Sequence, residues 1–386
     1  MSSGISNLGG ATLDLAGGTY SLSAPLLIPQ MYGNLRIIDG TLRAHPTFPP
    51  GGTVLQVGAS PCTVDGQKSC NENVALSGLV VDGGHIAAGC IAINSTMGAT
   101  LDSSSAVFGF SGCGIAINGG HETMVEETWV AAYFWSDKNK EHTDSTGICV
   151  NGNDHYLTNI IVFSARTGVA VSGAANLLSG VHTWNCATGN GGVGVLNSAS
   201  QNRFEGCYFD YTDLRLTVAV DLTIASSFFL GNAQLEFRAP APASEVRGVY
   251  ISGSAYYSTT AAPFLVNETQ GTWTSISDFV VEGLLWGGSA QPRAGLSRAS
   301  KAWQGRCADG PMRIDFSDVL AFPSALTATR TISSFSCDTA YKPCGVAVLA
   351  LAQPDTRAAV VQCEGGGNVS FTVTVDQSVD SALGWA

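Results

Sequence analysis

A row of aromatic and ionisable side chains recurs in three similar segments of the chain, 156–163, 177–184 and 203–210. Their apolar residues alternate as in a β-strand, whose successive side chains point to opposite faces. We predict two inward columns, Ile160, Val181, Cys207 and Val162, Thr183, Phe209, and two outward columns, Ile161, His182, Tyr208 and Phe163, Trp184, Asp210. Such an outward row is unfavourable unless something covers it. Sugars can do so, because their C–H faces pack on aromatic rings while imidazoles and carboxylates bond their hydroxyl groups.

Glycoside hydrolysis requires two carboxyl groups at the scissile bond, one protonated and one ionised. Several acids surround the outward row without selecting the pair. We predict that Asp210 acts with Asp154, which lies in the turn between the two strands of its repeat. His182 is expected to orient or tune one of them.

The remaining candidates are predicted to bind substrate. Arg203 and Arg215 flank the segment from Asp210 to Asp213 and can hold a sugar carboxylate by paired hydrogen bonds. The full predicted set of substrate-binding residues is His121, Glu122, Asp144, Trp184, Arg203, Tyr208 and Arg215.

Two other interpretations of these residues stay open. The aromatic row can be a subunit interface of a homo-oligomer, because interfaces also favour Tyr, Trp and Phe. Any single Asp in a turn more commonly caps the backbone. The sequence has no nucleophile elbow, no zinc-binding Cys or His pattern and no phosphate loop, so we expect neither a metal nor a cofactor.

Four strand–turn segments position this row, beginning at Gly114, Gly147, Gly168 and Gly192. Their starts are 33, 21 and 24 residues apart, as in a unit of about 20–45 residues that stacks on itself. The first interval is long because a charged insertion occupies 136–145. The overlay predicts two inward columns, Ile115, Ile148, Val169, Val193 and Ile117, Val150, Val171, Val195, and an outward column of small residues, Ala116, Cys149, Ala170, Gly194.

The repeat predicts an all-β fold, a right-handed single-stranded parallel β-helix. Helical periodicity is absent, and a β-sandwich would not repeat one strand–turn–strand unit. The residue pattern of the sequence changes near Lys301, where short segments with alternating apolar residues suggest a small C-terminal β-domain. We therefore predict a β-helix with its N-terminal cap over 1–300 and a β-domain over 301–386.

Composition limits the partners. The chain of 386 residues has a net charge of −12, which argues against nucleic acid and anionic membranes. It contains no apolar run long enough for a membrane span. The N-terminus lacks the regions of a signal peptide, yet eleven cysteines and sequons at Asn94, Asn267 and Asn368 favour an extracellular, secreted protein. We expect disulfides Cys62–Cys70 and Cys337–Cys344, a core role for Cys149, and a disulfide or core role for Cys186 and Cys207.

Longer stretches carry a family resemblance. The blocks beginning at Gly119 (GGHET), Gly180 (GVHTWN), Cys207 (CYFDYT) and Asp315 (DFSDVLAFP) resemble, in this order, the plant quartet-type polygalacturonases, as do those at Gly9 and Gly40. The resemblance implies a pectin-lyase-like right-handed β-helix that hydrolyses polygalacturonan or a related wall polymer. The Asn-Thr-Asp, Asp-Asp, Gly-His-Gly and Arg-Ile-Lys blocks of ordinary polygalacturonases are missing, so their catalytic residues cannot be transferred.

The leading hypothesis is a secreted glycoside hydrolase that acts on a pectin-like or other acidic wall polysaccharide. A polysaccharide lyase or epimerase on the same scaffold would instead use a His or Tyr base. A third hypothesis is a non-catalytic wall-binding solenoid.

Overall fold

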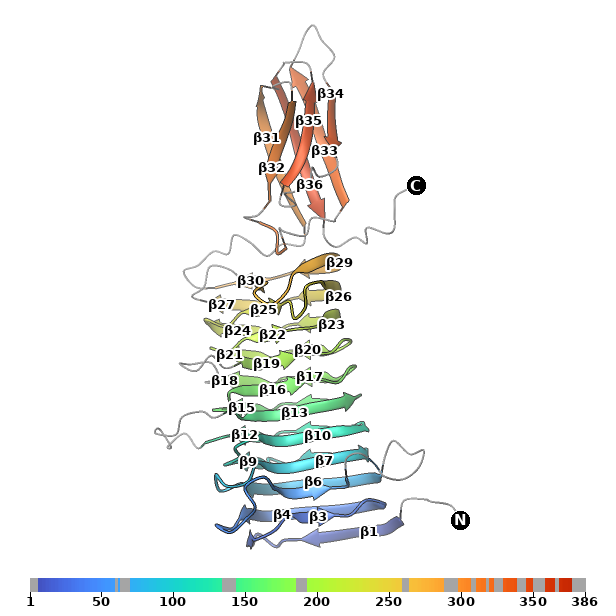
Figure 1. The fold of residues 1–386 in the computed structure, drawn as a ribbon, viewed down its shortest axis with the longest axis vertical. Coiled ribbons are helices and arrows are strands. Elements are labelled where there is room, and N and C mark those ends of the chain that lie inside the picture. The colour runs from blue at the N-terminus through green and yellow to red at the C-terminus, as the bar shows by residue number, and fades with distance from the viewer. Residues whose placement is uncertain are drawn as a thin grey trace.

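The computed structural model describes residues 6–59, 62, 70–133, 144–184, 193–258, 264–287, 298–306, 310–316, 319–322, 329–338, 345–349, 358–364 and 368–376. Its strands form successive coils that stack along one axis (Figure 1). Between residues 100 and 258, each strand pairs in parallel with the third strand further along the chain. Each coil therefore contributes one strand to each of three faces, and the predicted right-handed parallel β-helix is confirmed.

The first face contains the strands of the glycine-led repeats. Their bounds are β3 (Leu26–Ile28), β5 (Thr53–Val57), β7 (Gly89–Met97), β10 (Cys113–His121), β13 (Thr146–Asn153), β16 (Thr167–Val171), β19 (Val193–Asn197), β22 (Leu214–Leu216), β25 (Leu235–Arg238) and β28 (Phe264–Asn267).

The second face follows the first along each coil. Its strands are β1 (Ser6–Asp14), β4 (Tyr32–Ala44), β6 (Asn71–Asp82), β8 (Thr100–Asp102), β11 (Met124–Glu126), β14 (Tyr156–Thr158), β17 (Leu177–Ser179), β20 (Arg203–Glu205), β23 (Ala219–Ala225), β26 (Ser244–Ser252) and β29 (Trp273–Glu282).

The third face completes the coil, and β4 and β6 are long enough to continue into it. Its other strands are β2 (Thr19–Leu22), β9 (Ala106–Phe108), β12 (Trp129–Ala131), β15 (Ile161–Phe163), β18 (His182–Trp184), β21 (Tyr208–Asp210), β24 (Phe228–Gly231), β27 (Ala255–Ser258) and β30 (Leu285–Trp286).

Two small antiparallel sheets stand beyond the last coil (Figure 1). One contains β31 (Arg298–Arg306), β36 (Asn368–Asp376) and β33 (Thr329–Asp338), and the other β32 (Gly310–Asp315), β35 (Ala358–Glu364) and β34 (Gly345–Leu349). They have their own apolar core around Phe371, whereas Phe322 packs on Phe237 at 4.9 Å between ring centroids and closes the solenoid core. The division of the chain at 300/301 stays a prediction.

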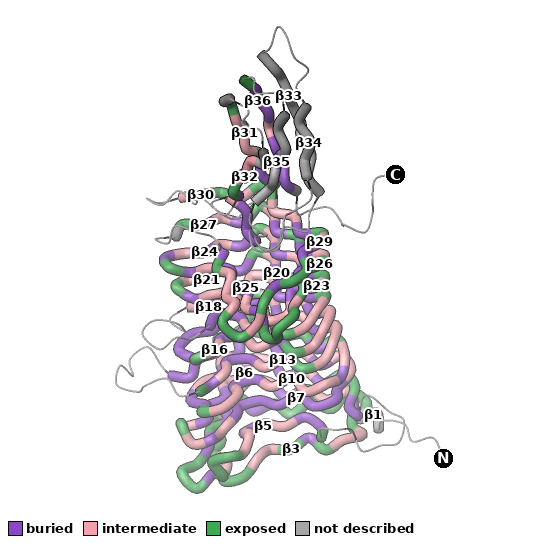
Figure 2. The backbone as a smooth tube through the Cα atoms, turned by 45° about the horizontal axis from the view of Figure 1, so that its top comes forward, coloured by how far each residue is buried: buried purple, intermediate pink, exposed green. Residues whose placement is uncertain are grey.

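Apolar side chains fill the interior of the coils. Buried residues, purple in Figure 2, recur along successive coils. The predicted inward residues of the second strand set, Ile160, Val181, Cys207, Val162, Thr183 and Phe209, are at most 1% exposed. Each of these predicted strands is, however, two short strands. A residue with positive φ separates them, namely Asn159 (52°), Gly180 (64°) or Gly206 (59°). The left-handed conformation turns the chain from the second face to the third while the inward alternation resumes beyond it.

The overlay of the fourth repeat is wrong by two residues. Val169 pairs with Val195, not with Val193, and Thr167 pairs with Val193. The small residue predicted outward, Gly194, is therefore replaced in its column by Leu196, which pairs with Ala170. Val-X-Val patterns repeat every two residues, so a shift of two preserves the alternation that guided the alignment.

Cysteine roles differ from the prediction at one position. Cys149 is bonded to Cys113 in a disulfide, so it is not a free core thiol. Its place in the outward column explains this, because it reaches the strand of the neighbouring coil. The Cys62–Cys70 disulfide is confirmed, and Cys207 is a free buried thiol. Cys186 and Cys344 lie outside the described residues.

Candidate functional site

The third face brings the predicted outward row together. His182 pairs with Tyr208, and Trp184 pairs with Asp210, on consecutive coils. All four side chains are partly exposed, as expected for positions that alternate with the buried Thr183 and Phe209.

Ring contacts run along this face over several coils. Phe163 stacks on Trp184 with 5.2 Å between centroids, and His182 lies 4.4 Å from Tyr208. The row extends past the predicted residues, because Trp129, Phe228 and Tyr257 continue it through further ring contacts. We call this the aromatic face: Trp129, Phe163, His182, Trp184, Tyr208, Phe228 and Tyr257.

A histidine–carboxylate pair lies within the aromatic face. His182 Nε2 is 3.8 Å from Asp210 Oδ2, and the two side chains are 29% and 23% exposed. Within the described part of the chain, His182 Nε2 and Asp210 Oδ1 are buried atoms without a hydrogen-bond partner. Burial lowers the pKa of His182, although the carboxylate acts to raise it, so the ring is mainly neutral at pH 7. Unpaired buried polar atoms are costly, which favours a site that a hydroxyl-rich ligand completes.

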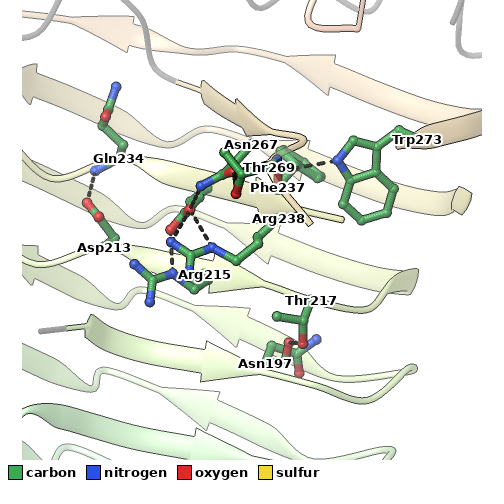
Figure 3. Close-up of polar contacts among 11 residues, drawn as sticks. Asn197, Asp213, Arg215, Thr217, Gln234, Phe237, Arg238, Asn267, Thr269 and Trp273 are labelled. Carbon is green, nitrogen blue, oxygen red and sulfur yellow. Dashed lines mark hydrogen bonds and ion pairs between the residues drawn. The ribbon is translucent and has the colours of Figure 1, made fainter. Parts of the chain in front are cut away.

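The turn after β21 carries a second carboxyl group, on Asp213. Two residues separate Asp213 from Asp210. Tyr211 has a φ of 57°, and Thr212 is fully buried with its hydroxyl oxygen 2.8 Å from that of Thr183. Asp213 Oδ1 accepts a hydrogen bond of 2.9 Å from the backbone N–H of Gln234 (Figure 3). Burial raises the pKa of Asp213, more than that hydrogen bond lowers it. The turn therefore holds two carboxyl groups three residues apart in different electrostatic environments.

An ionic cluster follows on the first face, beside Asp213 (Figure 3). Glu236, 1% exposed, accepts hydrogen bonds from Arg215 Nε, from Arg238 Nε at 2.8 Å and from Asn267 Nδ2 at 2.9 Å. Burial acts to raise the pKa of Glu236, but these donors outweigh it and the pKa is lowered. Glu236 is thus an ionised carboxylate that fixes two arginines.

The structure places Asp154 elsewhere. Its Oδ2 lies 3.5 Å from His121 Nδ1, at the turn between the first and second faces. Asp210, by contrast, precedes the turn between the third and first faces. The length of the first face separates these turns, roughly 25 Å for the 8 residues of β13. Carboxyl groups that cleave one glycosidic bond are about 5–10 Å apart, so the fold does not bring the predicted pair together.

The other predicted residues are dispersed. Glu122 is exposed next to His121, and Asp144 is an exposed partner of Arg166. Arg203 is exposed on the second face, one face away from Arg215. The two arginines therefore do not form a joint clamp.

Two further features offer less chemistry. An apolar hollow of about 360 Å³ lies at the N-terminal end, lined by Leu13, Leu26, Leu27, Ile28, Pro29, Tyr32, Leu35 and Ile37. The described residues contain no group of three or more His, Cys, Asp or Glu side chains suited to a metal ion. Nor do they include a helix long and apolar enough to cross a membrane.

Comparison with known proteins places the chain. It is 32% identical over 332 residues to "Polygalacturonase QRT3" of Arabidopsis thaliana, a match that covers 84% of this chain. The chain belongs to the quartet-type polygalacturonase family. It spans 66% of that relative's length. No family model matches the sequence.

Solved structures similar to this family member agree with the fold. The tailspike of E. coli bacteriophage HK620, in complex with a pentasaccharide, has a TM-score of 0.55 and 11% identity, over 95% of this chain and 87% of its own. The ORF18 protein of Geobacillus virus E2 has a TM-score of 0.52 and 13% identity, over 91% of this chain and 68% of its own. At these identities the likeness concerns the β-helix alone.

Four residues of this family member were absent from the sequence-based candidates: Asp213, Glu236, Arg238 and Asn267. They lie on successive coils and meet only once the coils stack. The one signal within the sequence was the spacing of Asp213 from Asp210 and Arg215.

Proposed function

We propose that the protein is a secreted glycoside hydrolase that cleaves a pectin-like or related wall polysaccharide at the turn from Asp210 to Asp213. Asp213 serves as the general acid and Asp210 as the carboxylate that attacks or activates water. The observation that carries the proposal is the presence of two carboxyl groups on one anchored turn beside an aromatic face. Membership of the polygalacturonase family supports the reaction class.

The spacing supports these two carboxyl groups. Three residues of chain span at most about 10 Å, and the left-handed Tyr211 shortens the path. That limit applies to the Cα atoms, and the separation of about 5–10 Å between carboxyl groups that hydrolysis with retention or inversion requires is compatible with it. Thr212 anchors the turn through Thr183, so the carboxyl groups are held without substrate.

The environments divide the roles. Environments that push the pKa values of two acids apart identify the acid and the base. Burial raises the pKa of Asp213, which keeps its proton to higher pH than an ordinary Asp. Asp210 lies beside His182, whose neutral ring can orient a carboxylate or a water molecule.

In the reaction Asp213 gives its proton to the glycosidic oxygen as the bond from that oxygen to the anomeric carbon breaks. A water molecule supplies the hydroxyl group at the anomeric carbon, and its proton passes to a carboxylate. The products are a new reducing end and a new alcohol. Trp184 and Tyr208 are partly exposed and provide aromatic surface for the sugars next to the bond.

Secretion is part of the proposal. Two disulfides, Cys62–Cys70 and Cys113–Cys149, favour an oxidising compartment. Among the sequons, Asn94 is 7% exposed and donates hydrogen bonds to backbone oxygens, so glycosylation there would disrupt the fold.

A digest of wall polysaccharides tests the proposal. Incubation with pectins of different ester content, xylans and glucans should release reducing ends from a pectin-type polymer, without ultraviolet absorption by unsaturated uronates. Unsaturated products would assign a lyase instead. A protein that binds the aromatic-face ligand but releases no reducing ends would be a binding solenoid.

A further inference from the structure

The two sides of the Asp210–Asp213 turn differ in charge. On the third face, the outward side chains described on β12 to β30 are aromatic, aliphatic or alanine, apart from His182 and Asp210. None of those described positions carries a lysine or arginine. On the first face, Arg215 lies on β22 two residues after Asp213, and Arg238 ends β25 on the next coil.

The arginines outnumber their carboxylate. Arg215 and Arg238 share Glu236, so the three groups carry one net positive charge. Their side chains are 17% and 29% exposed, whereas that of Glu236 is 1% exposed. The carboxylate therefore lies behind the guanidinium groups, which can turn unused N–H donors to solvent. Asp213 adds no negative charge when it holds the proton that the proposed reaction needs.

Other arginines near the third face are balanced. Arg43 pairs with Asp82 at 2.7 Å, and Arg166 pairs with Asp144. Each of these is one cation for one carboxylate. In a chain of net charge −12, the Arg215–Arg238 pair is thus a local positive site next to the proposed point of cleavage.

An ionised uronate would be poorly placed on the aromatic face. Its carboxylate would lose water against rings that offer no counter-charge, and it would repel Asp210. A methyl-esterified or neutral unit meets neither cost, and its C–H face packs on Trp184 or Tyr208. The coils repeat every 4.8 Å or so, which is of the order of one sugar unit, so successive rings can serve successive units.

We infer that the substrate is a partly esterified uronan, with one free carboxylate bound by Arg215 and Arg238 and with uncharged units along the aromatic face. This inference rests on the proposed function and narrows it. A fully ionised chain would fail on the aromatic side, and a fully esterified chain would leave the arginines without an anion.

Homogalacturonans of equal length and graded methyl-ester content test this. The wild-type protein should cleave fastest at intermediate ester content and more slowly at both ends of the series. Arg238→Gln should lower the rate on the best substrate about tenfold, as expected for one lost charge-assisted hydrogen bond. It should also shift the ester content at which the rate is highest toward full esterification. Arg238→Lys keeps the positive charge, so the ester content of its best substrate should be that of the wild type.

Arg247→Gln is the matched control, because Arg247 pairs with Asp221 on the second face. It should alter neither the rate nor the optimum. Thermal unfolding of each variant shows whether it is folded. If Arg238→Gln is not folded, the dependence of the wild-type rate on ester content still tests the inference.

A rate that rises steadily as ester groups are removed overturns the inference and leaves the hydrolase intact. A rate that is highest at full esterification contradicts the binding of a free carboxylate by Arg215 and Arg238. Lys138 and Lys140 lie outside the described residues, so Lys138→Gln and Lys140→Gln are assayed in parallel. If they abolish a preference for the ionised polymer, that segment binds the anions and the inference is wrong. Failure to cleave any member of the series counts against the proposed function itself.

Discussion

His182 and Asp210 come from consecutive coils, and their Nε2 and Oδ2 atoms lie 3.8 Å apart on the third face. Neither strand alone contains the pair, because the parallel register places His182 beside Tyr208 and Asp210 beside Trp184. The distance is too long for a hydrogen bond, so both groups keep capacity for a ligand or a water molecule.

Replacement of the carboxyl groups separates their roles. Asp210→Asn and Asp213→Asn should each lower kcat by at least about a hundredfold, because general acid–base groups commonly contribute that much. Asp154→Asn should keep nearly full activity, since Asp154 pairs with His121 at the opposite edge of the first face. Reducing-end assays on folded variants measure this, and a severe loss in Asp154→Asn alone would return the acid/base role to that residue.

The pH dependence of kcat reports on Asp213. Because the general acid must be protonated, activity should fall as pH rises through its pKa, which burial raises above the ordinary value of about 3.9. The alkaline limb of the kcat profile should therefore lie above that value. Asp213→Glu should retain some activity with a displaced limb. An unchanged limb in that variant would show that another group is the acid.

Rings on the aromatic face should contribute to affinity. Trp184→Ala and Tyr208→Ala should each weaken oligosaccharide binding about tenfold, from the loss of roughly 1.5 kcal/mol of apolar contact. Tyr250→Ala is the control, because Tyr250 is 39% exposed on the second face. Titration calorimetry distinguishes them. If the face is instead a subunit interface, the Trp184 and Tyr208 variants will change the mass in solution and not the affinity.

Acid stability should depend on His155. This ring is fully buried, its Nδ1 accepts a hydrogen bond from the Thr123 N–H, and burial lowers its pKa from 6.5 to about 4. The unfolded chain takes up a proton near pH 6.5 and the folded chain only near pH 4. Stability from this group is therefore complete above pH 6.5 and falls by about 3 kcal/mol as pH drops to 4.

The matched variant for this effect is His155→Asn. On the next two coils, Asn176 Oδ1 accepts from the His155 N–H and Asn202 Oδ1 accepts from the Asn176 N–H. Asparagine at 155 can repeat that bond without a titrating ring. Denaturant unfolding at pH 7 and pH 4.5 should show a smaller pH effect in the variant. Equal losses in both proteins would assign the acid sensitivity to other groups.

Glycines at the start of the first-face strands lie in a column where the packed coils leave no room for a side chain. A methyl group at Gly147 would lie 2.5 Å from Val162 Cγ1 and 2.6 Å from the Gly168 carbonyl oxygen. Gly147→Ala should lower the free energy of unfolding by about 2 kcal/mol, the usual result of overpacking. Gly51→Ala should be nearly neutral, because nothing lies within 4 Å of its added methyl group. Similar unfolding midpoints for the two variants would contradict this packing.

Much of the fold followed from the sequence, because inward β-branched columns and glycine-led turns recur with a stacking period. The alternation also predicted which side of the third face His182, Trp184 and Asp210 occupy. It did not distinguish a bend from a continuous strand, since one left-handed residue such as Gly180 preserves the alternation on both sides. It also allowed the two-residue shift at Val193.

The site was harder to predict than the fold. Asp154 follows a strand and Asp210 ends one in similar repeats, and only the bends show that they lie at opposite edges of the first face. The cluster around Glu236 depends on the register of three consecutive coils, which had no shared motif to align. Asp213 gains its raised pKa from burial, which a sequence does not show.

The most direct test of the central claim is a crystal structure of the Asp213→Asn variant with a bound uronan oligosaccharide. We predict sugar density across the turn from Asp210 to Asp213, with pyranose rings on Trp184 and Tyr208 and a glycosidic oxygen within hydrogen-bonding distance of residue 213. Density at the His121–Asp154 corner or in the apolar N-terminal hollow, with the turn empty, would contradict the assignment.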